Sequence, residues 1–181
     1  MRRRAALVIA VLLIAGGTAF AQDRGDISGG YRFMRSEDVN VGKGWYVDVS
    51  GHVTDMVSIV GDVGGSYKGE SESFAGVTIE ADIKIHTFAG GLKVRASAVS
   101  PSVVPFGQVL FGVATAKTEA SGGGISVSES LTDPMLNLSG GVDVRGGAPV
   151  GLRAQVGWWR IFSEGEAFNA FHISIGATIG F

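Results

Sequence analysis

The chain lacks cysteine altogether, and this absence excludes several kinds of chemistry at once. Its 181 residues can form no disulfide framework, no thiolate metal site and no cysteine nucleophile. The formal net charge is only −2, so the composition predicts no nucleic-acid partner. Beyond the N-terminal segment, no apolar run approaches the roughly 18 residues that a membrane-spanning helix needs.

The N-terminal segment has the pattern of a secretory signal peptide. Three arginines, Arg2 to Arg4, precede an apolar run from Ala5 to Ala15, and Ala19-Phe20-Ala21 has the small-x-small form of a cleavage site. The apolar run is shorter than a membrane span of about 20 residues. We therefore expect a signal peptide over residues 1–21 and an exported domain over residues 22–181, with a retained anchor as the alternative.

Glycine is abundant, and its placement disfavours helix through most of the chain. The 29 glycines are scattered through apolar stretches, where each would cost a helix about 1 kcal/mol. Apolar and polar residues instead alternate with period two, which indicates strands with two different faces. This alternation is found in eight segments: residues 26–35, 44–53, 56–67, 85–95, 104–117, 134–144, 150–162 and 170–181.

The connections between these segments follow a second pattern, in which long and short links alternate. The link at Thr54 and Asp55 is very short, and so is the link from Gly146 to Pro149. The links after the first, third, fifth and seventh segments are polar and mostly longer. We therefore expect antiparallel neighbours, with both termini on the side of the short turns.

Two-faced strands alone leave two architectures open, because the apolar face can point inward or outward. A soluble sandwich or barrel buries its apolar face, whereas a membrane barrel turns it toward lipid. Charges of both signs share the polar face with glycine, serine and threonine, and inside a narrow barrel such charges must pair. We predict a barrel-interior polar network of Arg32, Asp48, Asp62, Lys93, Arg95, Asp143, Arg153 and Gln155.

Aromatic residues favour the membrane alternative. Large aromatics fall near the ends of the segments that lie away from the short turns, mostly on the apolar face, as in the interfacial girdle of a membrane barrel. These residues are Trp45, Tyr67, Phe88, Trp158, Phe162 and Phe171. The sequence therefore predicts an all-β fold, an eight-stranded antiparallel up-and-down transmembrane β-barrel. The register of 104–117 stays open, because Leu110 shares a face with Gln108.

The closing stretch FHISIGATIGF, taken with the signal peptide and the eight segments, resembles the small bacterial outer-membrane β-barrel proteins. That family includes outer membrane protein X and the barrel domain of outer membrane protein A. The resemblance implies a monomer in the outer membrane of a Gram-negative cell, in contact with outer-membrane lipid and lipopolysaccharide. It also implies handling by periplasmic chaperones and by the barrel assembly machinery. The matching C-terminal assembly motif is Phe171, Ile173, Ile175, Ile179 and Phe181.

Candidate chemistry is weak in this sequence. His172 and Ser174 resemble the His-x-Ser pair of some outer-membrane lipid A deacylases, but no acidic residue follows Ser174 and the pair lies on the predicted interior face. The three histidines show no metal-ligand spacing, and the glycines at 121–126 lack the Lys and Ser or Thr of a phosphate loop. We therefore predict no catalytic residue, no metal and no cofactor.

The sequence accordingly predicts a non-enzymatic outer-membrane protein with a structural or loop-mediated interaction role. A lipid-modifying outer-membrane enzyme and a soluble periplasmic β-barrel binding protein are the alternatives. The interior charges favour a plug over an open pore. The acidic loops favour simple solvation, with binding of divalent cations or basic partners as the sharper hypothesis. Residues 74–83 are expected to extend a hairpin above the membrane.

Overall fold

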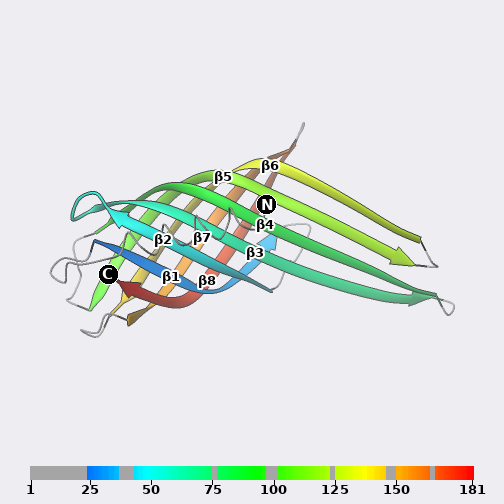
Figure 1. The fold of residues 1–181 in the computed structure, drawn as a ribbon, viewed down its shortest axis with the longest axis horizontal. Coiled ribbons are helices and arrows are strands. Elements are labelled where there is room, and N and C mark those ends of the chain that lie inside the picture. Colours follow the sequence, from blue (N-terminus) through cyan, green and yellow to red (C-terminus); the bar gives the residue numbers. More distant parts are fainter. Residues whose placement is uncertain are drawn as a thin grey trace, which may run out of the picture.

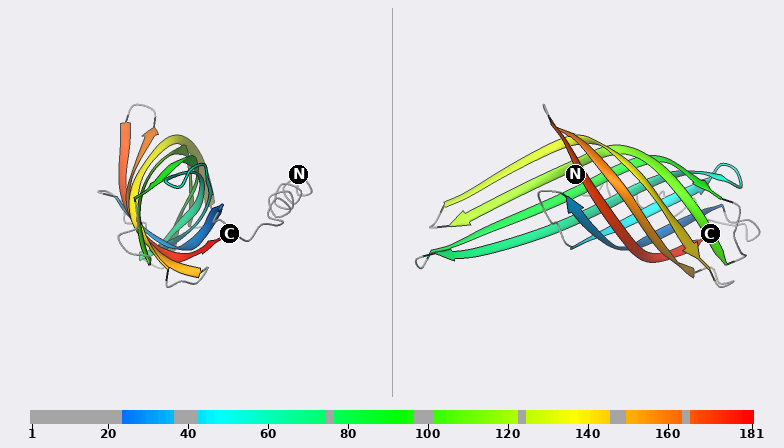
Figure 2. Two further views of the ribbon diagram at one scale, coloured as in Figure 1. Left: turned by 90° about the vertical axis from the view of Figure 1, so that its left-hand side faces the viewer. Right: turned by 180° about the vertical axis from the view of Figure 1, so that it is seen from behind.

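Eight antiparallel strands close into one barrel, as the alternation predicts. The computed structural model describes residues 24–36, 43–74, 77–96, 102–122, 125–145, 150–163 and 166–181, and the predicted signal peptide lies outside them. Each strand pairs with the next, and β8 closes the barrel by pairing with β1 (Figures 1 and 2). The strands are β1 (Gly25–Ser36), β2 (Lys43–His52), β3 (Val57–Phe74), β4 (Val77–Arg95), β5 (Val103–Gly122), β6 (Ile125–Val144), β7 (Val150–Ser163) and β8 (Glu166–Gly180).

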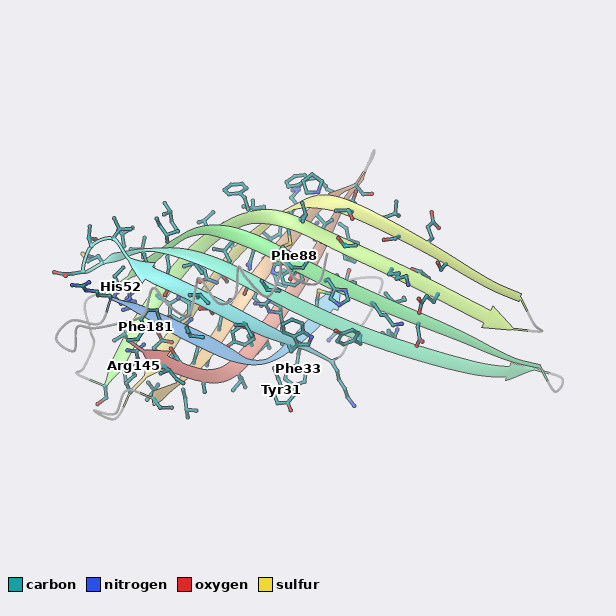
Figure 3. All side chains as sticks on the ribbon, in the orientation of Figure 1. Tyr31, Phe33, His52, Phe88, Arg145 and Phe181 are labelled. Atoms are coloured by element: carbon teal, nitrogen blue, oxygen red, sulfur yellow. The ribbon has the colours of Figure 1, made fainter. Side chains whose placement is uncertain are left out.

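The end of the barrel that holds the C-terminus and the turn at residues 53–56 is called the proximal end below, and the opposite end is the distal end. The backbone of Phe181 lies in the seam between β8 and β1: its carbonyl accepts from the Arg24 N–H at 2.7 Å, and its own N–H donates to Gly25 at 3.0 Å. His52, Arg145 and Phe181 all lie at the proximal end (Figure 3).

Four strands continue past the barrel at the distal end. Pairing of β2 with β3 ends at Lys43 and Tyr67, and pairing of β6 with β7 begins at Met135 and Ile161. Beyond these pairs β3 to β6 continue together as a long sheet, as Figure 1 shows. This distal sheet comprises residues 68–74 and 77–83 of β3 and β4 and residues 113–122 and 125–134 of β5 and β6. The pairing of β7 with β8 extends only two residues past Ile161.

The distal sheet corrects the prediction for two of the long links. Residues 69–82 and 118–133 were expected to be connections, yet most of them are paired strand residues. Alternation could not identify these strands, because residues such as Ser128, Glu129 and Leu131 are all exposed in succession. The expected hairpin extension at 74–83 is confirmed, since β4 begins at Val77.

The polar and apolar faces separate cleanly in the barrel wall. In β7, Leu152, Ala154 and Val156 are exposed, whereas Arg153 and Gln155 between them are buried. The structure resolves the register of 104–117: Val109, Phe111 and Val113 point outward, and Gln108 and Leu110 point inward. Among the described residues no helix is long and apolar enough to cross a membrane.

Candidate functional site

The barrel interior is ordered along its axis, and β1 gives the order. Its inward side chains are Asp26, Ser28, Arg32 and Met34, from the proximal end toward the distal end, and all are almost fully buried. Each belongs to a different layer of side chains contributed by the whole barrel. A proximal charge cluster surrounds Asp26, a second ion pair contains Arg32, and an apolar layer contains Met34.

Arg153 is the centre of the proximal charge cluster. Its Nε donates to Asp143 Oδ1 at 2.6 Å, and its Nη1 donates to Asp48 Oδ1 at 2.8 Å. Its Nη2 donates to Asp143 Oδ2 at 2.8 Å and to Asp26 Oδ1 at 3.0 Å. The guanidinium also lies over the ring of Phe106, at 4.8 Å from the ring centroid. One cation therefore binds three carboxylates from three different strands, and its planar fork suits that arrangement.

Two further cations complete the proximal charge cluster. The Lys93 ammonium lies 3.3 Å from Asp26 Oδ1 and 3.5 Å from Asp48 Oδ1. Arg95, which is partly exposed at the proximal end, donates to the other oxygen of Asp26. Burying a charge is costly unless it is paired and hydrogen-bonded. Here each of the three carboxylates has at least one cationic partner.

Sequence reasoning missed Asp26, although Asp26 contacts Lys93, Arg95 and Arg153. Its side chain is completely buried. Adding it gives four interior carboxylates, which match the four interior cations in number. The carboxylates are Asp26, Asp48, Asp62 and Asp143, and the cations are Arg32, Lys93, Arg95 and Arg153. The signal was available, because Asp26 lies an even number of residues from Arg32 on a two-faced strand.

The second ion pair joins Arg32 and Asp62 in a two-pronged geometry. Nη1 and Nη2 of Arg32 donate to Oδ1 and Oδ2 of Asp62 at 3.1 and 2.7 Å. Arg32 Nε donates to Ser174 Oγ at 3.2 Å. The guanidinium lies between the rings of Tyr46 and Trp159, at 5.0 and 5.2 Å from their centroids. Both ions are thus satisfied without contact with the proximal charge cluster.

Gln155, the last of the eight predicted interior residues, lies inside the barrel but belongs to neither ion cluster. Neither its side-chain oxygen nor its nitrogen has a hydrogen-bond partner among the described residues, and the same holds for Gln108. Both amides are nearly inaccessible from outside. The structure therefore brings the seven charged residues of the prediction into two ion clusters, and it leaves Gln155 outside both.

His172 and Ser174 are buried parts of the barrel filling. Ser174 Oγ lies 3.4 Å from His172 Nδ1, and His172 Nε2 lies 3.3 Å from the Asn137 side-chain oxygen. The two residues are 1% and 0% exposed. A carbonyl substrate could not approach the Ser174 oxygen in this geometry. Among the described residues, no group of His, Asp and Glu has the arrangement of a metal site.

An apolar layer closes the distal end of the interior. Met34, Met135, Trp159 and Ile161 pack there with two alanines, and Ile85 and Phe168 lie against them. This layer could not be recognised from the sequence, because its six buried members interrupt the polar faces of five different strands. The charged clusters are therefore separated from the distal opening by apolar side chains.

The outer face of the barrel wall is apolar, and its aromatic residues gather toward the distal end. Tyr67, Phe88, Phe162 and Phe171 are exposed there, and Trp45 donates from Nε1 to the Tyr67 hydroxyl at 3.2 Å. Tyr31, Phe33 and Phe111 are exposed on the same outer face. The residues of the predicted assembly motif, Phe171, Ile173, Ile175, Ile179 and Phe181, are likewise exposed on this face.

A small ion-pair group lies at the base of the distal sheet. Glu119 accepts from Lys117 at 2.5 Å and from Lys84 at 2.6 Å. The hydrogen bonds from Lys117 and Lys84 lower the pKa of the Glu119 carboxyl to about 2, and the bond to Glu119 raises the pKa of Lys84. These groups are accessible to solvent, so screening limits their effect on stability.

Comparison with known proteins identifies solved structures that share this fold. No protein-family model matches the sequence, and no curated protein matches it either. Among solved structures, the chain is similar to the attachment invasion locus protein Ail of Yersinia pestis, with a TM-score of 0.63 and 19% sequence identity. The match covers 89% of this chain and 100% of Ail. It is also similar to Neisserial surface protein A, with 15% identity, 87% and 96% coverage, and a TM-score of 0.60. The chain therefore has the fold of the small eight-stranded outer-membrane β-barrels.

Proposed function

We propose that this chain is a non-enzymatic outer-membrane protein that presents the distal sheet as an interaction surface. The apolar outer face of the barrel wall carries this proposal. Ile27, Tyr31 and Phe33 on β1 are 45%, 73% and 50% exposed, and comparable residues surround the barrel. In water so large an apolar surface would favour association or precipitation, whereas hydrocarbon is a matching solvent.

The closed hydrogen bonding of the barrel supports the same location. Every strand of the wall has two neighbours, so its backbone groups are satisfied without water, as crossing a lipid core requires. The charges that lipid would exclude are inside and paired. A soluble periplasmic barrel would be expected to have the opposite arrangement, with its apolar face inside.

The distal sheet supports the interaction role, because it has two open edges. Residues 68–74 of β3 and residues 125–134 of β6 pair on one side only. An open edge presents backbone groups that can pair with an extended segment of another protein. Pro134 lacks an N–H and so limits such pairing near the base of the β6 edge.

Cell fractionation tests the proposed location. After expression with the native N-terminus, we expect the protein to sediment with the outer membrane on a sucrose gradient. The folded barrel should also migrate differently from a boiled sample on a denaturing gel. Recovery in the soluble periplasmic fraction would overturn the proposal.

We propose further that the distal sheet faces the outside of the cell and the proximal end faces the periplasm, and the absence of cysteine allows a direct test of this orientation. A Glu129→Cys variant would place a unique thiol on the exposed distal sheet, and an Asp55→Cys variant would place one in the proximal turn. We expect a membrane-impermeant maleimide to label the first variant on intact cells and the second only after the outer membrane is permeabilised. Labelling in the reverse order would contradict the orientation.

A shortened barrel separates an interaction role from a purely structural one. Residues 69–82 and 118–129 can each be replaced by Asn-Gly, which favours a tight hairpin turn. Each replacement joins residues that are paired across their hairpin, Lys68 with Ile83 and Lys117 with Ser130. We expect this variant to keep the heat-modifiable barrel and to sediment with the outer membrane like the parent protein. Adhesion of expressing cells to surfaces should fall. Unchanged adhesion would leave only the structural role.

A further inference from the structure

A groove crosses the outer face of the barrel from β4 to β8. Its volume is about 1180 Å³. Gly107 and Gly140 pair with each other at its floor and face outward, so no side chain fills the wall there. Larger apolar side chains stand around them, including Phe111 and Val156. Absence of side chains at two adjacent positions thus hollows a surface that would otherwise be convex.

One row of paired residues gives the groove its direction. Within this row Leu92 pairs with Val109, Val109 with Leu138, Leu138 with Trp158, and Trp158 with Phe171. All five residues line the groove. Trp158 and Phe171 also belong to the aromatic group at the distal end, so the groove runs from the middle of the wall to the distal rim of the apolar face.

Two guanidinium groups lie at this distal limit. Arg160 is the next outward residue after Trp158 on β7, and Arg35 of β1 pairs directly with Phe171. Both are exposed. Arg160 lies over the ring of Phe162, at 5.8 Å from the centroid. In the part of the chain that the structure describes, neither arginine forms an ion pair with a carboxylate.

We propose that the groove binds an acyl chain of a phosphate-bearing membrane lipid, and that Arg35 and Arg160 bind its phosphate. This inference rests on the proposed function, because only a protein in a bilayer meets such a lipid in this orientation. The apolar lining matches a hydrocarbon chain and offers it no hydrogen bond to lose. Guanidinium forks at the end of the groove match a phosphate group in charge and geometry.

Lipid binding in detergent micelles tests the inference independently of membrane location. The refolded protein would be titrated with dioleoyl phosphatidic acid and, separately, with dioleoylglycerol, which has the same acyl chains and no phosphate. Bound lipid would be counted by native mass spectrometry. We expect phosphatidic acid to bind about tenfold more tightly, because charged hydrogen bonds to phosphate are among the stronger polar contacts. Equal affinity for the two lipids would overturn the headgroup assignment.

Variants divide the site into its two parts. An Arg35→Gln and Arg160→Gln double variant should lose roughly tenfold in affinity for phosphatidic acid and keep its affinity for dioleoylglycerol. A Gly107→Leu variant should weaken both lipids, because its side chain fills the groove. A Cβ at Gly107 would come no closer than 4.0 Å to the nearest atom, the Ser139 carbonyl oxygen, so Gly107→Ala provides a milder version that the wall accommodates.

Two matched controls make the outcome specific. Gly61→Leu adds the same side chain to an outward position with open space around it, and Arg24→Gln removes the same charge at the exposed proximal end. Both should bind lipid like the parent protein. An equal loss of lipid affinity in Gly61→Leu and Gly107→Leu would overturn the assignment of the groove as the acyl-chain site. Displacement of phosphatidic acid by inorganic phosphate at comparable concentration would overturn it too. Failure of cell fractionation alone would instead reject the membrane location.

Discussion

Arg153 and Asp26 form an ion pair inside the barrel, with 3.0 Å between Nη2 and Oδ1, although 127 positions separate them in the chain. Arg153 lies on β7 and Asp26 on β1, and β8 lies between those strands. Their side chains therefore meet across the interior, and only after β8 has paired with β1. The pair links the strands on the two sides of the closing seam.

Removing the Arg153 side chain should destabilise the barrel strongly. An Arg153→Met variant would leave Asp143 without a cation and would weaken the pairing of Asp26 and Asp48. Breaking a buried ion pair by removing one partner typically costs about 3–5 kcal/mol. Urea unfolding in lipid vesicles, followed by tryptophan fluorescence, would measure the loss. Arg24→Met at an exposed site should change the free energy of unfolding by less than about 0.5 kcal/mol; equal losses in both variants would contradict the pairing.

Substitution by alanine should change the stability of the barrel in opposite directions at Gly112, which faces inward, and at Gly61, which faces outward. A Cβ at Gly112 would collide with the Phe88 carbonyl oxygen and the Ala89 side chain of β4, whereas a Cβ at Gly61 meets nothing within 4 Å. Gly112→Ala should therefore cost about 1–3 kcal/mol, and Gly61→Ala should be neutral or stabilise by up to about 1 kcal/mol. Unfolding midpoints of the two variants would decide, and a stable Gly112→Ala barrel would show that β4 and β5 can separate slightly there.

Acid should weaken the distal sheet through Glu119. Its pKa in the folded protein is lowered from 4.5 to about 2, so its contribution is fully present above pH 4.5 and is lost as the pH falls toward 2. A carboxyl carbon NMR titration of Glu119 in micelles should show this low midpoint. Lys84→Gln together with Lys117→Gln should return the midpoint toward 4.5; an unchanged midpoint would mean that neither lysine holds the carboxylate.

Removal of Phe181 should impair assembly more than export. Phe181 supplies two backbone groups to the seam with residues 24 and 25, and the family resemblance assigns its ring to recognition by the assembly machinery. The folded fraction on a heat-modifiability gel should fall in the deletion while the total of processed chain stays constant. Phe181→Ala keeps the backbone groups, so a comparable fall there would assign the effect to the ring. Normal barrel yield in both variants would make the terminal residue incidental.

Much of this architecture could be predicted from local pattern. The eight segments, their faces, and the short turns at residues 53–56 follow from period-two alternation and from composition. Strand length in the distal sheet could not be predicted, because no buried face imposes alternation on residues such as Glu129 and Ser130. Backbone pairing between neighbouring hairpins forms those strands instead.

The candidate sites divide in the same way. Alternation assigns Arg153 and Asp48 to the interior, but it carries no information on which strands face one another around the circumference. Closure and stagger of the strands bring Arg153 to Asp26. They also pair Gly107 with Gly140 at the floor of the groove and place Arg160 and Arg35 at its distal limit. Face is a local property with a period of two residues, and the sequence alone decides it. Position around a closed barrel depends on all eight pairings together, so only the tertiary structure decides which side chains meet.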